Sequence, residues 1–217
     1  MTGRSGNSGP GGVEALYPFL YAEDGDVEAV LAEVTKSTAA KAREIVMLRE
    51  MIAGQYAARM AECAAAMARS FAEGGKLLTF GNGGSSTDAQ AIAYAFLRPA
   101  TGLPLPAISL TSDAAVITAL GNDVAFDIVF SRQLSALGRK HDVAFGVSTS
   151  GNSANLLKAF EEANRRGLLT VGLAGYDGGK MAEAGTIDFL FVVPSHSVHR
   201  IQEAQTTIYH LLWELVR

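Results

Sequence analysis

Two segments of the sequence repeat one plan, in which an apolar run leads through a loop of glycine and hydroxyl residues into a helical pattern. The first, Lys76 to Phe96, holds the loop GNGGSS at 81–86, and the second, starting at Asp142, holds the loop TSGNS at 149–153. Glycine permits positive φ and a close approach of the backbone, and amides at a helix N-terminus attract anions. Small polar residues also fill ordinary turns between strands and helices. Two such loops can nevertheless converge on one phosphate, and they predict an anion site.

Apolar runs alternate with helical patterns through most of the chain. Predicted strands cover the run from Lys76 and the segments 105–110, 142–148, 168–174 and 189–193, and predicted helices follow the first loop and cover 113–120, 126–137, 154–166, 180–184 and 200–216. Strands that are apolar on both faces belong to a parallel sheet covered by crossover helices. The prediction is therefore an α/β fold, a three-layer αβα sandwich around a five-stranded parallel sheet. Ligands of such sheets bind beyond the carboxyl ends of the strands, where both loops fall.

The N-terminal third differs from the rest in composition. Residues 2–12 are rich in glycine and serine, so residues 1–26 are predicted to form a disordered or loosely packed extension. Between Asp26 and Phe71 there is no proline, and apolar residues recur at helical spacing. This pattern predicts two long helices, the second ending at Gly74 and Gly75. Residues 27–217 then form one domain that includes this helical arm.

Composition excludes several classes of function. The net charge of −4, without a run of Lys or Arg, argues against a nucleic-acid surface. Cys63 is the only cysteine, so neither an intrachain disulfide nor a cysteine metal cluster can form. No apolar segment approaches the roughly 20 residues that span a bilayer, and residues 1–12 lack the plan of a signal peptide. We expect a cytoplasmic protein with a small ligand and no membrane partner.

Five motifs together resemble one known family. They are GNGGSS at 81–86, GND at 121–123, STSGNSAN at 148–155, GYDGG at 175–179 and PSHSVHRIQE at 194–203. In their order along the chain and in their residue pattern they resemble the sugar isomerase (SIS) domain, over a range from Val27 to the C-terminus. Within it, they are similar to the phosphoheptose isomerases, which interconvert sedoheptulose 7-phosphate and a heptose 7-phosphate, and to the replication-initiator-associating proteins. The resemblance implies a flavodoxin-like sandwich and a homotetramer with sites at subunit interfaces.

The resemblance also implies roles for individual residues. The sugar phosphate would be held by two sets of loop residues, namely Asn82 and Ser85 together with Ser148, Thr149, Ser150 and Ser153. Asp123 and Gln202 match positions that face the sugar, and His210 matches the catalytic histidine. Each of these three also has a plainer interpretation, with Asp123 as an N-terminal cap, Gln202 as a helix-surface residue, and His210 paired with the residue four positions later.

Two departures from the family pattern bear on catalysis. The position of the isomerases' catalytic Glu, ten residues beyond the match to Ser85, is Ala95, and a zinc-ligand His of some members is replaced by Ala91. Only Gln202 and His210 remain of the four zinc ligands, whereas a catalytic zinc normally takes three protein ligands. We therefore expect no zinc and no other cofactor. Gln202 and His210 lie roughly 12 Å apart along a helix, so they reach one ligand only from different subunits.

Two interpretations of function stay open. One is an aldose-ketose phosphosugar isomerase in which Glu203, or a residue of a neighbouring subunit, replaces the missing base. The other is a module that binds a phosphorylated sugar without converting it, as a sensor or as an adaptor with a protein partner. A dinucleotide fingerprint fits less well, because Ser86 stands at the third glycine of G-x-G-x-x-G and no acidic residue ends the strand at Leu110. The prediction is a phosphosugar-binding protein in which isomerase activity is doubtful.

Overall fold

The computed structural model describes residues 27–99 and 102–216. The extension predicted over residues 1–26 lies outside the described residues. The chain divides into two compact units, Met1–Arg43 and Glu44–Arg217. In the first unit the described residues form the start of helix α2 (Val27–Ala72), where the Thr35 hydroxyl donates to the Leu31 carbonyl at 2.8 Å.

Helix α2 corrects one prediction, because a single helix of 46 residues stands where two were expected. Alanine, methionine, arginine and glutamate dominate its sequence, and these residues favour helix without interruption. Gly54 does not break the helix, and a Cβ added there would meet no atom within 4 Å. The predicted C-terminus is confirmed, since Gly74 takes a φ of 82° and the Gly75 amide donates to the Ser70 carbonyl.

Five parallel strands form one sheet, as the apolar runs predicted. Their order in the sheet is β2-β1-β3-β4-β5. The strands are β1 (Leu77–Gly81), β2 (Ala107–Ser109), β3 (Val143–Val147), β4 (Leu169–Gly175) and β5 (Phe189–Val193). The central strands β1 and β3 are buried along their whole length. This burial on both faces explains why their sequences are continuously apolar.

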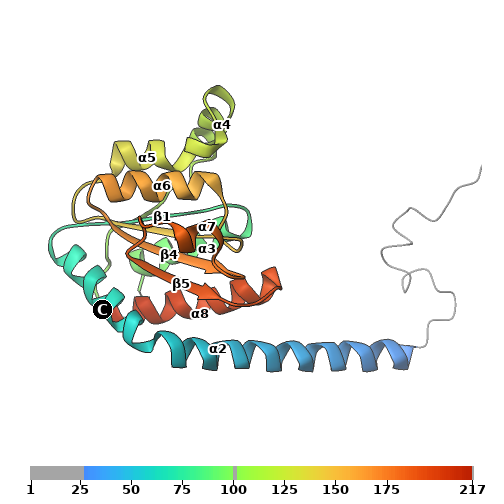
Figure 1. Ribbon diagram of the computed structural model, residues 1–217. Helices are drawn as coiled ribbons and strands as arrows, with labels where there is room; N and C mark the ends of the chain where they lie inside the picture. Colours follow the sequence, from blue (N-terminus) through green and yellow to red (C-terminus); the bar gives the residue numbers. More distant parts are fainter. Residues whose placement is uncertain (1–26, 100–101, 217) are drawn as a thin grey trace, which may run out of the picture. The chain divides into compact units, whose positions relative to one another are not determined.

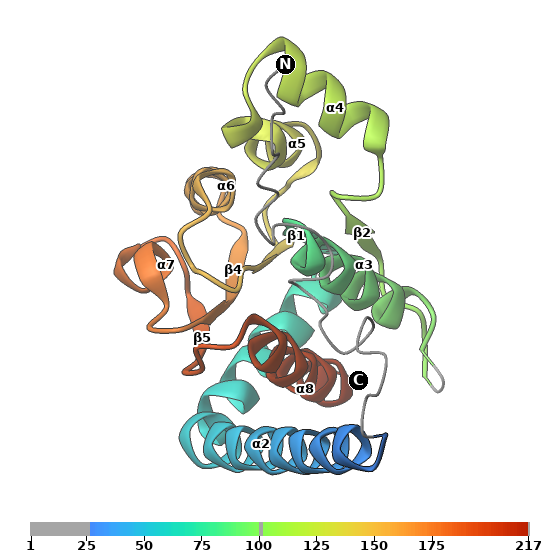
Figure 2. The same ribbon diagram turned by 90° about the vertical axis from the view of Figure 1, so that its right-hand side faces the viewer.

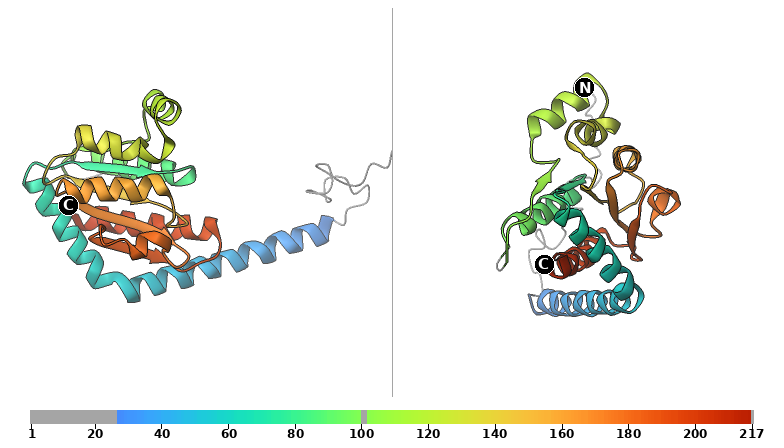
Figure 3. Two further views of the ribbon diagram at one scale, coloured as in Figure 1. Left: turned by 45° about the horizontal axis from the view of Figure 1, so that its top comes forward. Right: turned by 90° about the vertical axis from the view of Figure 1, so that its left-hand side faces the viewer.

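Helices cover both faces of this sheet (Figures 1 and 2). They are α3 (Gly84–Leu97), α5 (Val129–Leu137), α6 (Ala154–Arg165), α7 (Gly179–Glu183) and α8 (Val198–Val216), whereas α4 (Ala114–Asp123) contacts α5 and projects away from the sheet. One core cluster joins α3, α8 and the part of α2 after Glu44 to one face, and the other joins α5, α6 and α7 to the opposite face. The views in Figure 3 show the same division. The predicted three-layer αβα sandwich is confirmed.

Helix boundaries differ from the prediction mainly around α4 and α5. The segment predicted as one helix over 126–137 is a short 3₁₀ helix, η2 (Phe126–Ile128), followed by α5. Asp113 caps α4 by accepting a hydrogen bond from the Val116 amide at 3.0 Å, and α4 runs on to Asp123. No residue of α4 is buried.

Among the residues described, no helix combines the length and apolar character needed to cross a membrane.

Candidate functional site

Both predicted loops leave the sheet at the same edge. Gly81 and Val147, the last residues of β1 and β3, are paired across the sheet. Strand β2 lies on one side of β1 and strands β3 to β5 on the other, so the loops meet where the strand order reverses. The carboxyl ends of the strands face the viewer in Figure 2. The structure therefore brings the two loops together, as the sequence predicted.

Two asparagines join the loops directly. The Asn82 Nδ2 donates to Asn155 Oδ1 at 2.8 Å, and the Asn155 Nδ2 donates back to Asn82 Oδ1 at 2.9 Å. Asn155 lies in the first turn of α6 and is buried. The sequence motif contained Asn155, but its partner could not be predicted because the two residues are 73 positions apart. Asn82 thus fixes the distance between the loops.

Hydroxyl groups of the second loop are held in place by backbone amides. The buried Ser148 Oγ accepts from the Gly151 amide at 3.0 Å, and the Ser150 Oγ accepts from the Asn152 amide at 3.2 Å. Each hydroxyl keeps its own proton to donate. Ser153 is the N-cap residue of α6, yet its side chain makes no capping bond. Its hydroxyl is therefore available to a ligand at the helix N-terminus.

The GYDGG turn at 175–179 supports the second loop from behind. A Cβ at Gly151, whose φ is 65°, would lie 2.0 Å from the Gly178 carbonyl oxygen, so the two backbones are in tight contact. The Lys180 amide donates to Asn152 Oδ1 at 3.0 Å, and the Met181 amide donates to the Gly151 carbonyl at 3.0 Å. These contacts give this motif a structural role that its sequence did not reveal.

Gln202 of α8 lies against the first loop. Its Nε2 donates to Asp88 Oδ2 at 3.3 Å, and a Cβ at Gly84 would lie 2.4 Å from the same nitrogen. Gln202 is therefore half-buried and in contact with the first loop. Burial raises the pKa of Asp88 above its ordinary value, an effect that the Gln202 hydrogen bond partly offsets. Sequence reasoning did not select Asp88, although it is one turn into α3.

Gln205, one turn further along α8, was also missed. Its Nε2 donates to the Ser148 carbonyl at 3.0 Å, and its side chain is fully buried. Its Oε1 has no hydrogen-bond partner within the described part of the chain. Gln202 and Gln205 are three positions apart and face the first and second loops, respectively. Helix α8 therefore contacts both loops, which the RIQE motif alone did not indicate.

Three predicted residues are not brought to the loops by any contact among residues 27–99 and 102–216. Glu203 pairs with Arg200 on its own helix, at 2.6 Å between Oε2 and Nη1. The exposed His210 packs its ring 4.8 Å from the Tyr209 ring, and no ion pair with Glu214 is found among the described residues. Asp123, also exposed, is the last residue of α4, so the interpretation as an N-terminal cap is wrong.

Along α3, the two residues that follow Asp88 on the same face of the helix are alanines, Ala91 and Ala95. Residues 88, 91 and 95 are spaced by three and four positions, so they lie in one row along the helix. Ala91 is exposed and Ala95 is partly buried. Over residues 27–99 and 102–216, no three side chains of His, Cys, Asp or Glu are grouped so that they could hold a metal ion. Ala91 and Ala95 themselves have no side-chain atom that could coordinate a metal.

A pocket of 710 Å³ opens beside the second loop. Ser150 and Asn152 line one side, and the other side comes from residues that follow β4 and β5, including Tyr176 and His196. These two rings lie 6.0 Å apart between centroids. The volume falls within the usual range for small-molecule sites. A ligand anchored at Ser150 therefore has room to extend.

Known proteins match this architecture. The family description "SIS domain" matches residues 42–175. This chain belongs to the SIS-domain family.

Within that family the chain is similar to phosphoheptose isomerases. The protein of that name from Desulfovibrio desulfuricans is 46% identical over 182 residues, which are 81% of this chain and 84% of the relative. The one from Aquifex aeolicus is 43% identical over 163 residues, covering 74% and 84% of the two chains. The solved phosphoheptose isomerase of Neisseria gonorrhoeae superposes with a TM-score of 0.78 at 37% identity, covering 84% of this chain and 98% of the other.

Proposed function

We propose that this protein binds a phosphorylated sugar of the sedoheptulose 7-phosphate class between its two loops, without efficient isomerisation. The observation that carries the binding proposal is the paired loops, joined by Asn82 and Asn155 at the carboxyl edge of the sheet. The substrate class comes from the name of the relatives, phosphoheptose isomerase.

The phosphate is held by hydroxyls and by amides at two helix N-termini. Ser148, Thr149, Ser150 and Ser153 supply hydroxyls from the second loop, and Ser85 supplies one from the first. Helices α3 and α6 begin at these loops, so the positive ends of both helix dipoles face the anion. In this arrangement Gln202 contacts the sugar from α8, beside the first loop, and Asp123 and His210 are contributed by neighbouring subunits.

Weak turnover follows from the chemistry of the reaction. An aldose-ketose isomerisation moves a proton between adjacent carbons, and it needs a carboxylate base near the substrate. Ala95 and Ala91 cannot accept a proton or hold a metal. Glu203, a substitute considered from the sequence, is engaged with Arg200. Binding without conversion suits a sensor, or an adaptor with a protein partner of its own.

One observation favours an active enzyme as the second candidate. Asp88 is a carboxyl beside the first loop, in contact with Gln202, and burial raises its pKa. A raised pKa suits a general base at neutral pH. In this alternative Asp88 takes the proton that a Glu at position 95 would take.

Calorimetry with sedoheptulose 7-phosphate, combined with a turnover assay, tests the proposal. We expect binding by the wild type, and a loss of ~1.5–3 kcal/mol in each of Ser150→Ala and Ser153→Ala, because each removes a hydrogen bond to a charged oxygen. Ser112→Ala, an exposed serine outside both loops, is the matched control. Unchanged affinity in both loop variants would exclude the phosphate site. Rapid turnover that Asp88→Asn abolishes would establish the second candidate.

The assembly we propose is a cytoplasmic homotetramer built on the long N-terminal helices. Gln202 and His210 are eight positions apart on α8, so one ligand can meet both only from two subunits. Exposed apolar side chains of α2, such as Leu31, supply the contact surface, whereas Leu48 and Ile52 are buried in the core of this chain. Light scattering at micromolar concentration measures the assembly, and a monomer would contradict this arrangement.

A further inference from the structure

A second pocket, of 620 Å³, lies at the opposite edge of the sheet. Its walls come from the C-terminal part of α2, from the segments that precede β3 and β4, and from the start of β5. The serine loops leave the carboxyl ends of the strands, whereas this pocket lies at their amino ends. The length of β3, from Val143 to Val147, separates the two sites by at least about 13 Å.

Cationic side chains line this pocket without partners of their own. Arg69 and Lys140 come from segments that are far apart in the sequence, and neither side chain has a hydrogen bond or ion pair within residues 27–99 and 102–216. A third basic group, His141, contacts the carboxylate of Glu73 through Nδ1. Unpaired cations in a concave site attract anions. Here two cations are grouped although the chain as a whole has a net charge of −4.

One carboxylate, that of Asp188, also lines the pocket. Its Oδ2 accepts from both the amide and the hydroxyl of Thr170, at 2.9 Å each. These two hydrogen bonds from Thr170 compensate part of the negative charge of Asp188. The pocket retains an excess of positive charge on the side of Arg69 and Lys140.

The remaining wall is mixed, with the polar Asn164 beside the half-buried Leu169 and Phe189. The guanidinium of Arg59 lies 5.2 Å from the centre of the Phe189 ring. A purely inorganic anion would leave this surface in contact with water. The wall suits a ligand that joins an anionic group to a flat, weakly polar ring.

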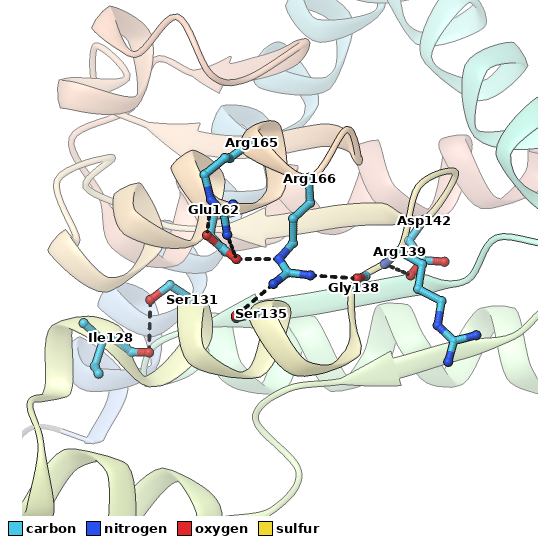
Figure 4. Close-up of polar contacts among 9 residues, drawn as sticks. All are labelled: Ile128, Ser131, Ser135, Gly138, Arg139, Asp142, Glu162, Arg165 and Arg166. Carbon is cyan, nitrogen blue, oxygen red and sulfur yellow. Dashed lines mark hydrogen bonds and ion pairs between the residues drawn. The ribbon is translucent and has the colours of Figure 1, made fainter.

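The loop that carries Lys140 and His141 is held rigidly. The buried carboxylate of Asp142 accepts from the Lys76 amide at 2.9 Å, the Lys76 Nζ at 2.6 Å and the Arg139 amide at 2.8 Å. On its other side, the Arg166 guanidinium donates to the Gly138 carbonyl and to Ser135 Oγ (Figure 4).

His141 itself takes a φ of 73°, a conformation that costs energy for any residue except glycine. These contacts fix the backbone of the loop, which lowers the backbone entropy lost on binding.

We propose that this pocket binds a nucleoside diphosphate. The two phosphates lie between Arg69 and Lys140, and the base packs against Leu169 and Phe189. Two unpaired cations match a diphosphate in charge, and the apolar side chains of the wall match the base. The site shares no residue with the serine loops, so it does not depend on the function proposed for them.

Calorimetry on the full chain with ADP, pyrophosphate and adenosine tests this site. We expect ADP to bind and adenosine to bind at least about tenfold more weakly, because it lacks the charge-assisted hydrogen bonds. Pyrophosphate competes with ADP. Arg69→Gln and Lys140→Gln each weaken ADP about tenfold. Both side chains are exposed, so the variants keep the fold, which circular dichroism confirms.

Two controls separate this site from other sources of ADP binding. Arg132→Gln changes an exposed cation outside the pocket and retains ADP affinity. Ser150→Ala retains ADP affinity as well, because the serine loops lie at the other edge of the sheet. Absence of ADP binding at millimolar concentration, equal affinity for adenosine, unchanged affinity in Lys140→Gln and Arg69→Gln, or loss of binding in Ser150→Ala would each overturn the proposal.

Discussion

Asn82 and Asn155 exchange two hydrogen bonds, at 2.8 and 2.9 Å, and thereby connect the loop after β1 to the first turn of α6. Each amide satisfies the donor and the acceptor of the other in a region where Asn155 is buried. The pair fixes how far apart the two serine loops stand. It is therefore the contact on which the geometry of the proposed phosphate site depends most directly.

Asn155→Ala is expected to destabilise the fold by about 1–3 kcal/mol, because it leaves the Asn82 amide without its partner. Urea unfolding measures this loss. Asn164→Ala, an exposed position on the same helix, should change stability by less than about 0.5 kcal/mol. In the double variant Asn82→Ala, Asn155→Ala the two losses should not add, since both report one interaction. Additive losses would show that the pair is not coupled.

Gly151→Ala is expected to disrupt the second loop. The new methyl group would stand 2.0 Å from the Gly178 carbonyl oxygen, at a φ of 65° that alanine rarely adopts. We expect weaker binding of sedoheptulose 7-phosphate and a lower melting temperature. The matched change Gly54→Ala, in open space within α2, should instead stabilise the protein by about 0.5–1 kcal/mol. Equal effects of the two changes would contradict this account of Gly151.

Ala95→Glu, alone or with Ala91→His, is expected to raise the turnover of sedoheptulose 7-phosphate. A positioned general base typically contributes ~10²–10⁴-fold, and in the proposed function Ala95 stands at the position that the resemblance assigns to this base. A coupled assay of the aldose product measures the change. Ala95→Gln, which has a similar shape without a basic carboxylate, serves as the control and should stay inactive. A wild type already as fast as its Glu variant would refute the argument.

Asp88 is expected to make stability depend on pH. Burial raises its pKa in the folded chain, so the folded state binds this proton more tightly than the unfolded state does. As pH falls from neutral, the folded state is protonated first and the wild type gains stability relative to Asp88→Asn. The gain is complete below the ordinary Asp pKa of about 3.9.

Urea unfolding of the wild type and Asp88→Asn between neutral pH and pH of about 4 measures this difference. Glu183→Gln, a change at an exposed carboxyl, is the control. A wild type that loses stability relative to Asp88→Asn on acidification would show that the sign is wrong.

The amino-acid sequence by itself determined the alternation of strands and helices and the position of both serine loops. Strands β1 and β3 are continuously apolar because both faces are buried, and such a run can be recognised without knowing its neighbours. The glycines and serines after them mark the loops for an equally local reason, since they concern turn conformation and helix N-termini. The motifs sufficed for the SIS family, which the comparisons confirm.

Tertiary structure decided the contacts between segments that are distant in the chain. Nothing in a local pattern pairs Asn82 with Asn155, places Gln202 beside Gly84, or groups Arg69 with Lys140 at one pocket. These relationships depend on strand order and on the crossing of helices over the sheet, which local periodicity does not encode. The single helix α2 is a different case, because local propensity itself explains it: helix-favouring residues continue through the place where two helices were expected. Local propensity predicts the elements, whereas packing determines which side chains meet.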